Sequence, residues 1–181
     1  MRLLIRRAAQ NDAPGIGRLH ARSWQSAYRG ILSDAYLAGP VEAERAALWH
    51  RRMSEPAETP PVVVVADDGG EIVGLACILP GHDPRWGSLI DNLHVAPDRK
   101  RAGLGRRLLA EAARLVPPAF REVPLHLTVF AANKAAQAAY DRYGGTVAER
   151  LEAAEPDGGT YPVLRYRWPG PAELLARLEI A

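Results

Sequence analysis

Residues 89–116 read LIDNLHVAPDRKRAGLGRRLLAEAARLV and combine an apolar strand, a basic turn and an amphipathic helix. The turn closes with Gly103-Leu104-Gly105, after which Leu104, Leu108 and Ala112 recur at helical spacing. The first turn of a helix exposes unpaired backbone N–H groups and the positive end of the helix dipole. Glycines there let an anion approach the main chain, and neighbouring Arg and Lys side chains add positive charge. The stretch therefore predicts a phosphate-binding turn, with a helix cap beside a solvated basic face as the plainer alternative.

Three known phosphate-binding patterns can be compared with this turn. A Rossmann fingerprint needs a third glycine where Leu108 stands, and a P-loop needs a G-K-[ST] sequence that is absent. The third pattern, a strand, a basic residue, x-x-G-x-G and a helix, fits residues 100–105. In this form the stretch resembles the acyl-CoA-binding motif [QR]-x-x-G-x-[GA] of the GCN5-related N-acetyltransferase (GNAT) family. Lys100 replaces the usual Gln or Arg, so we expect backbone N–H groups to carry much of the diphosphate binding.

A second segment, residues 133–145, is similar to another pattern of this family, N-x-x-A-x-x-x-Y-x-x-x-G-[FG]. Asn133, Ala136 and Tyr140 are three and four residues apart, so a helix places them on one face. The small Ala side chains of that face allow a flat ligand to pack closely. An Ala-rich helix with Asn133 as its cap explains the segment equally well in isolation. Its position after a strand and downstream of the basic turn favours the family resemblance, and residues 24–32 also resemble the acceptor-side helices of a subgroup.

The order of the expected elements indicates the fold. We expect strands at 3–7, 62–66, 71–79, 88–95, 125–130, 147–151 and 163–168, and helices starting near Asn11-Asp12, Ser33, Val41, Gly103, Asn133 and after Pro169. Strands that cross over through helices imply a mixed sheet with helices on both faces. With the resemblance, this predicts an α/β (α+β) fold with a mostly antiparallel sheet of about six to seven strands. We expect residues 1–181 to form one N-acetyltransferase domain.

The composition excludes several classes of protein. With 181 residues, 48% apolar and 24% charged, the chain is typical of a soluble globular protein. A net charge of +2 gives no general attraction to nucleic acid, and no apolar stretch is long enough to span a membrane. The single Cys77 cannot form an internal disulfide, and the five histidines are too scattered to indicate a metal site. We expect a cytoplasmic protein without a metal ion.

The resemblance implies acetyl transfer from acetyl-CoA, with coenzyme A as the product, to an amine. In this family the pantetheine arm pairs with the strand before the turn as an added strand would, and a main-chain N–H there stabilises the oxyanion. The expected cofactor-binding residues are Leu93, His94, Val95, Lys100, Arg101, Ala102, Gly103, Leu104, Gly105, Arg106, Asn133, Ala136 and Tyr140.

Acetyl transfer needs a proton donor and a base; the resemblance implies the donor but does not settle the base. An alkyl ammonium with a pKa near ~10.4 must lose a proton before it attacks, and the leaving thiolate gains from a proton donor. We expect Tyr140 to be that donor and Asp91 to be the base, directly or through water. His94 and His126 are rival bases, because an imidazole suits proton transfer near neutral pH. Strict strand alternation places Leu89, Asp91, Leu93 and Val95 on one face and Ile90, Asn92 and His94 on the other.

The acceptor is less defined by the sequence. Trp24, Tyr28 and Trp86 are candidates to line its pocket, and Glu152 or Glu155 to attract a cationic amine. We expect a small-molecule amine or a peptide as partner, and neither nucleic acid nor a membrane; a homodimer is compatible with the sequence. Two other functions compete. One is a non-catalytic acyl-CoA-binding or sensory domain of the same fold. The other is a nucleic-acid-binding module built on residues 99–107, which the low net charge and the dispersed acidic residues disfavour.

Overall fold

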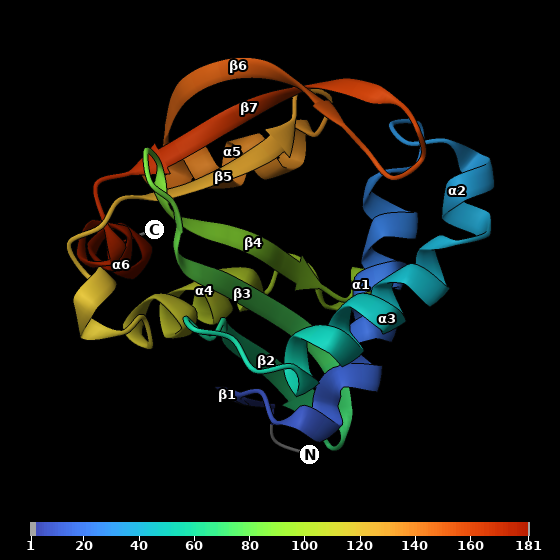
Figure 1. Cartoon of the computed structure of the whole chain (residues 1–181), viewed down its shortest axis with the longest axis horizontal. Coiled ribbons are helices and arrows are strands. Elements are labelled where there is room, and N and C mark those ends of the chain that lie inside the picture. The colour runs from blue at the N-terminus through green and yellow to red at the C-terminus, as the bar shows by residue number, and fades with distance from the viewer. Residues whose placement is uncertain (1–2, 181) are drawn as a thin grey trace.

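The computed structural model describes residues 3–180, in which seven strands form one sheet (Figure 1). The elements follow the chain as β1 (Leu4–Arg7), α1 (Ala13–Ala27), α2 (Asp34–Ala38), α3 (Val41–Ser54), β2 (Val62–Asp68), β3 (Glu71–Asp83), β4 (Gly87–Val95), α4 (Leu104–Arg114), β5 (Leu125–Phe130), α5 (Lys134–Arg142), β6 (Thr146–Ala154), β7 (Thr160–Trp168) and α6 (Pro171–Ile180). The expected α/β class and mixed sheet are thereby confirmed.

The sheet has the strand order β1-β2-β3-β4-β5-β7-β6, and its neighbours are antiparallel except for β4 and β5. These two parallel strands pair only through Ser88 with Leu125 and Leu89 with His126. Beyond those pairs the strands separate, so the sheet divides into a β1–β4 part and a β5–β7 part that meet at one end. Figure 1 shows the two parts diverging, with β6 and β7 above and β2 to β4 below.

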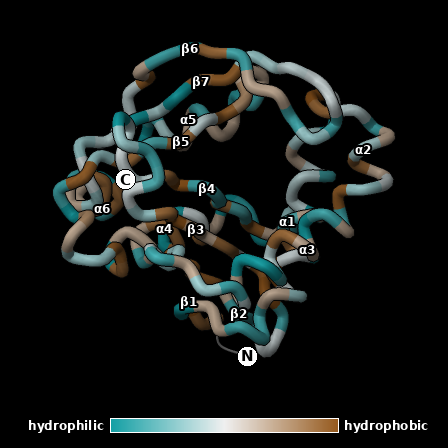
Figure 2. The backbone as a smooth tube through the Cα atoms, in the orientation of Figure 1, coloured by the Kyte–Doolittle hydropathy of each residue, from teal (hydrophilic) through white to brown (hydrophobic). Residues whose placement is uncertain are grey.

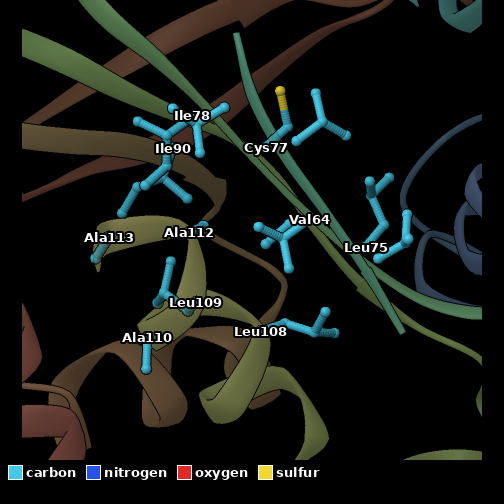
Figure 3. Packing of buried hydrophobic residues seen from close by; sticks show 14 of the residues in the cluster. Val64, Leu75, Cys77, Ile78, Ile90, Leu108, Leu109, Ala110, Ala112 and Ala113 are labelled. Atoms are coloured by element: carbon cyan, nitrogen blue, oxygen red, sulfur yellow. The ribbon is translucent and has the colours of Figure 1, made fainter. Parts of the chain in front are cut away.

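Helices cover both faces of the sheet. Helices α1 and α3 pack together on one face, and α4 packs on the other against β2, β3 and β4. Figure 3 shows the layer between α4 and the sheet, which includes Val64, Ile78, Ile90, Leu108, Leu109 and Ala112, all buried. Hydrophobic segments gather where α4 meets β3 and β4, as Figure 2 shows. Within residues 3–180, no helix combines the length and the apolar character that crossing a bilayer requires.

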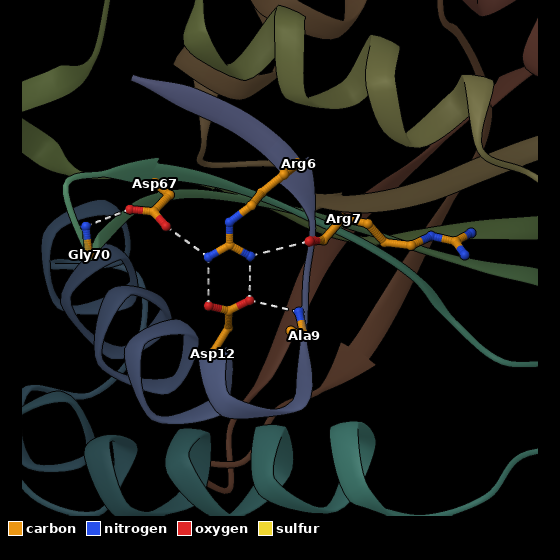
Figure 4. Close-up of polar contacts among 6 residues, drawn as sticks. All are labelled: Arg6, Arg7, Ala9, Asp12, Asp67 and Gly70. Atoms are coloured by element: carbon orange, nitrogen blue, oxygen red, sulfur yellow. Dashed lines mark hydrogen bonds and ion pairs between the residues drawn. The ribbon is translucent and has the colours of Figure 1, made fainter. Parts of the chain in front are cut away.

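A network around Arg6 ties the start of the chain to the β2–β3 turn (Figure 4). The guanidinium of Arg6 donates two hydrogen bonds to the carboxylate of Asp12, at 2.7 and 2.9 Å, and one to Asp67 at 2.8 Å. Asp12 also accepts from the N–H of Ala9, and Asp67 from that of Gly70. Arg6 lowers the pKa of both carboxyl groups by hydrogen bonding to them. Asp12 therefore joins β1 to α1 through Arg6, and its side chain does not cap α1 as its position had suggested.

Several predicted boundaries shift. Strand β3 continues to Asp83, where it pairs with Gly87, so the predicted loop at 80–87 shortens to a tight turn. Helix α1 begins at Ala13, directly after the expected start at Asn11-Asp12, and ends at Ala27. The predicted caps Ser33 and Asn133 are confirmed, because Ser33 accepts from the N–H of Tyr36 and Asn133 from that of Ala136. These two caps, which depend on hydrogen bonds within three residues, agree with the sequence.

The contact of α4 with β3 predicts a coupled stability change. An added Cβ at Gly74 would lie 2.6 Å from Cδ1 of Leu108, which has no exposed surface. Leu108→Ala should lower the free energy of unfolding by about 2–5 kcal/mol through a cavity, and Gly74→Ala by about 1–3 kcal/mol through overpacking. In the double variant the Gly74→Ala cost should shrink, because the colliding atoms are gone.

Urea unfolding of the four proteins of this cycle measures the coupling. Leu4→Ala is the control, because Leu4 is 55% exposed and its truncation should change the stability little. Strictly additive effects of Gly74→Ala and Leu108→Ala would show that α4 does not pack on β3 at this point.

Candidate active site

A cleft of about 590 Å³ lies where β4 and β5 separate. Residues 90–95 of β4 and residues 127–130 of β5 form its two inner edges. The start of α4 closes one end, one face of α5 covers it, and residues 23–28 at the end of α1 line the other end. Twelve of the thirteen predicted cofactor-binding residues and Asp91 line this cleft, Ala102 being the exception. Segments far apart in the chain thus converge on one cavity.

The turn before α4 has the backbone geometry of an anion-binding site. Gly103 is the N-cap residue of α4 with φ of 71°, and Arg101 has φ of 67°. The left-handed conformation suits glycine, whereas at Arg101 it costs roughly 1–2 kcal/mol. No side chain caps α4, whose first helical hydrogen bond runs from the N–H of Arg107 to the carbonyl of Gly103 at 3.1 Å. The N–H groups of residues 104–106 are therefore available to an anion.

Some basic side chains near this turn already have partners within the protein. Arg99 forms an ion pair with Asp68 at 2.7 Å, and Arg106 donates to the carbonyl oxygen of Leu178 in α6. Lys100 and Arg101 line the cleft and have no ion-pair partner among residues 3–180. Arg142 of α5 also lines the cleft, and sequence reasoning missed it. Little in the sequence favours Arg142, because it stands two residues after Tyr140 and helical spacing places it off the predicted face.

One face of α5 forms a wall of small side chains. Asn133, Ala136 and Tyr140 line the cleft, as the three-and-four spacing predicted, and Ala139 lies beside them. The rings of Tyr166 and Trp168 lie 5.6 and 6.2 Å from that of Tyr140 and hold it in place. Burial raises the pKa of Tyr140, so its phenol is neutral and can donate a hydrogen bond across the physiological range.

The predicted alternation along β4 holds as far as Asp91 and is wrong from Asn92 onward, because the strand carries a β-bulge. Asn92 lies opposite Cys77 and Ile90 opposite Ile78, so Asp91 has no partner on β3. Cys77 points away from α4 in Figure 3, whereas Ile78 and Ile90 face it. Asp91 therefore falls on the side of Asn92 and His94, where it meets α3. Leu93 and Val95 fall on the α4 side, with Val95 beside Gly105.

At the bulge, Asp91 becomes part of a hydrogen-bonded chain of polar side chains on the face of the sheet that α1 and α3 cover. Ser23 of α1 hydrogen-bonds Nδ1 of His94 at 2.9 Å, and Nε2 of His94 lies 3.3 Å from the amide oxygen of Asn92. The amide nitrogen of Asn92 donates to Asp91, and Arg52 of α3 forms an ion pair with Asp91 at 2.5 Å. Every donor in this chain meets an acceptor if Nε2 of His94 carries the proton and Nδ1 accepts from Ser23. Ser23 had a sequence signal as a polar residue on an apolar helix face, whereas Arg52 had none.

The structure separates the two rival histidines. His94 lines the cleft and stacks on His20 with ring centroids 4.5 Å apart. Burial, together with the charges of Lys100 and Arg45, lowers the pKa of His94 to about 3, so it is neutral at physiological pH. His126 does not line the cleft; its Nδ1 lies 2.9 Å from Nη1 of Arg165.

The end of the cleft beyond α1 is aromatic and carries one carboxylate. Trp24, Tyr28 and Phe130 line it. Trp86, the third aromatic candidate for the acceptor pocket, does not line it; its ring contacts the guanidinium groups of Arg85 and Arg165 instead. Of the two candidate glutamates, Glu155 lines the cleft and Glu152 does not.

Sequence comparison finds one family whose model matches this chain. A model of the acetyltransferase (GNAT) family matches residues 19–145. A probable N-acetyltransferase of Mycobacterium tuberculosis is 32% identical over 120 residues, covering 64% of this chain and 66% of the relative. An uncharacterized N-acetyltransferase of Bacillus subtilis is 27% identical over 114 residues, covering 62% of this chain and 63% of the relative. These matches span just under two thirds of either relative.

Solved structures share the fold. The PaiA N-acetyltransferase of Thermoplasma acidophilum, determined in complex with coenzyme A, aligns with a TM-score of 0.72 at 16% identity, over 93% of this chain and all of that one (100%). A putative acetyltransferase of Salmonella typhimurium, YncA, determined with acetyl-CoA, aligns with a TM-score of 0.65 at 16% identity, over 93% of this chain and 94% of that one. At such identities the likeness concerns the fold.

The buried histidines predict that acid destabilises the protein. Burial lowers the pKa of His20, and burial together with the charge of Arg165 lowers that of His126 to about 4. Unfolded histidines titrate near ~6.5, so between that pH and about 4 the unfolded state binds more protons than the folded state. Stability is therefore full above this window and falls as the pH drops through it. Urea unfolding followed by tryptophan fluorescence should show midpoints that decrease steadily across the window.

His126→Gln removes one of these groups and should flatten the dependence of stability on pH. His50→Gln is the matched control, because His50 is exposed on α3 and should leave the slope unchanged. Equal slopes for His126→Gln and the unaltered protein would contradict the assignment.

Proposed function

The chain belongs to the acetyltransferase (GNAT) family, and from that premise we propose that it transfers the acetyl group of acetyl-CoA to an amine. The amine attacks directly, within a ternary complex of protein, acetyl-CoA and acceptor. The observation that carries this proposal is the cleft between β4 and β5, which has a basic glycine turn at one end and a carboxylate among aromatic rings at the other. One end suits phosphates and the other suits an amine.

The donor binds through the turn and the free edge of β4. The N–H groups of residues 104–106 point the positive end of α4 at the diphosphate, and Lys100, Arg101 and Arg142 surround it. The pantetheine arm carries amides in an extended chain, which matches an unpaired strand edge. Residues 93–95 of β4 offer such an edge, because β5 has already separated from them. The shape of the cleft and the free hydrogen-bonding groups of the β4 edge both support acetyl-CoA as the acetyl donor.

The reaction forms one bond and breaks another at the acetyl carbon. The neutral amine attacks the thioester carbonyl, and a backbone N–H of β4 donates to the oxyanion that develops. Collapse of the tetrahedral intermediate forms the amide and breaks the carbon–sulfur bond. The amine's proton leaves to a base, and the sulfur receives a proton or a strong hydrogen bond as its negative charge grows.

Tyr140 is the proposed donor to sulfur. Its phenol lines the cleft on the α5 wall, and no other described residue hydrogen-bonds its hydroxyl. Burial raises its pKa, which keeps the phenol protonated but opposes complete transfer of its proton. Exclusion of water also raises the pKa of the departing thiol, so the pKa values of the phenol and the thiol shift in the same direction. Tyr140 therefore acts first as a hydrogen-bond donor to the developing thiolate.

Asp91 remains the proposed base, through water or directly. The bulge turns its carboxylate toward the face of the sheet that α1 and α3 cover, where Arg52 forms an ion pair with it at 2.5 Å. That ion pair fixes the position of the carboxylate. His94 is close by, yet a pKa of about 3 makes its imidazole a poor proton acceptor. The charge and position of Asp91 support it over the histidine.

The test of the function is release of coenzyme A thiol with a panel of amines and peptides, alongside calorimetric titration with acetyl-CoA. We expect saturable binding of acetyl-CoA and amine-dependent thiol release. Binding without release across the panel would favour the non-catalytic sensory function instead. Absence of saturable binding would contradict both.

Tyr140→Phe should lower kcat by about 10²-fold, because a positioned acid contributes on that order. The dissociation constant of acetyl-CoA should change little, since the ring that packs in the cleft is retained. Initial rates of thiol release and calorimetry measure the two effects separately.

Tyr166→Phe is the control, because it removes a neighbouring phenol that donates to Asp141 at 2.7 Å and does not line the cleft. An unchanged kcat for Tyr140→Phe would remove Tyr140 from the proton-donor role.

A further inference from the structure

The charges that line the cleft are separated by sign. Its basic residues, Arg99, Lys100, Arg101, Arg106 and Arg142, belong to the turn before α4 and to α4 and α5. Its only carboxylates among residues 3–180 are Asp91 and Glu155. Asp91 is neutralised by Arg52, whereas no described side chain forms an ion pair or hydrogen bond with the carboxylate of Glu155. Glu155 is thus the unpaired charge at the end of the cleft opposite the phosphate-binding turn.

Aromatic rings surround the space that Glu155 faces. Trp24 and Tyr28 meet edge to face with ring centroids 5.2 Å apart, and Tyr28 meets Phe130 in the same way at 4.9 Å. All three rings line the cleft. A carboxylate beside aromatic faces is the combination that binds an organic cation, by charge and by cation–π attraction.

Arg45, whose charge acts on Glu155, forms no ion pair with it. The guanidinium of Arg45 lies 4.4 Å from the ring centroid of Trp24 and does not line the cleft. Its ion-pair partner is Glu44 at 3.4 Å. Burial, and then the charge of Asp157, raise the pKa of Glu155, while Arg45 has a smaller opposing effect. A cation that entered the cleft would offset this cost.

A hydrogen bond at the acceptor end joins the β6–β7 hairpin to α2. Asp157, two residues beyond Glu155, accepts from the N–H of Ser33 at 2.8 Å and from the hydroxyl of Tyr161 at 2.6 Å. The first contact ties the β6–β7 hairpin to the start of α2, and the second lies within the hairpin. Behind them, Leu32, Tyr36 and Val163 belong to a separate hydrophobic cluster that joins α2 to β7. The tie favours a compact acceptor over a polypeptide that passes through.

From this geometry we infer that the acceptor is a small diamine, whose second ammonium group binds Glu155 while its reacting amine points toward Tyr140. The inference rests on the proposed acetyl transfer and assigns its acceptor class. Glu155 holds the end of the acceptor that does not react, so it acts in binding and selectivity. The aromatic wall of Trp24, Tyr28 and Phe130 contacts the methylene chain and the distal charge.

The experiment compares linear diamines, from diaminopropane to diaminohexane, with monoamines of the same length, by thiol release from acetyl-CoA. We expect the unaltered protein to prefer the diamine at one or two lengths by about tenfold or more in kcat/KM, the size of one charge-assisted contact. Glu155→Gln keeps the side-chain volume and should reduce this preference about tenfold, mainly through KM. Glu152→Gln is the matched control on the same hairpin, because Glu152 is exposed and lies outside the cleft.

A second readout does not depend on turnover. Calorimetric titration of diamine into the complex with coenzyme A should show binding that Glu155→Gln weakens and Glu152→Gln preserves. Equal rates for diamines and monoamines at every length would overturn the inference and leave acetyl transfer to simple amines in place. A preference that survives in Glu155→Gln would also overturn it. Absence of thiol release from any amine would overturn the proposed function and this inference together.

Discussion

The site depends on the separation of β4 from β5 after two residue pairs. Inside a sheet, such a separation leaves two strand edges whose N–H and C=O groups need other partners. The bulge at Asp91 falls just beyond the last pair and adds local twist to β4 at that point. The cleft is held open at its far end, where the hydrophobic cluster around Leu32, Tyr36 and Val163 joins α2 to the β5–β7 part. Pairing at one end and packing at the other therefore keep a ligand-sized gap in the middle of the protein.

Much of the fold was predictable because its signals are local. The glycine turn, the caps Ser33 and Asn133 and the apolar periodicity of α4 act within a few residues, and all agree with the structure. The same holds for the donor half of the site, since twelve predicted cofactor residues and the face of α5 meet in one cleft. Their binding roles stay predictions that the geometry supports. The family match over residues 19–145 covers these segments.

The acceptor half and the proton-transfer groups depend on contacts that no local pattern encodes. The pair of Arg52 with Asp91 joins residues that are 39 positions apart, and Arg106 is engaged by a carbonyl 72 positions away. A bulge shifts every following side chain to the other face, so the predicted alternation failed from Asn92 onward. Glu155 could be named as a candidate from its charge alone, but its position among aromatic rings required the fold. The tie between Asp157 and Ser33 likewise spans 124 positions.

The central claim is that acetyl-CoA completes the sheet at the free edge of β4 and places its phosphates on the start of α4. Amide hydrogen exchange, measured with and without acetyl-CoA, tests this directly because it reports on each backbone N–H. The account predicts new protection at residues 92–95 and 103–106, with β2 and its pairing to β1 and β3 unchanged. Protection confined to other segments, or no change at β4 while acetyl-CoA is bound, would contradict it.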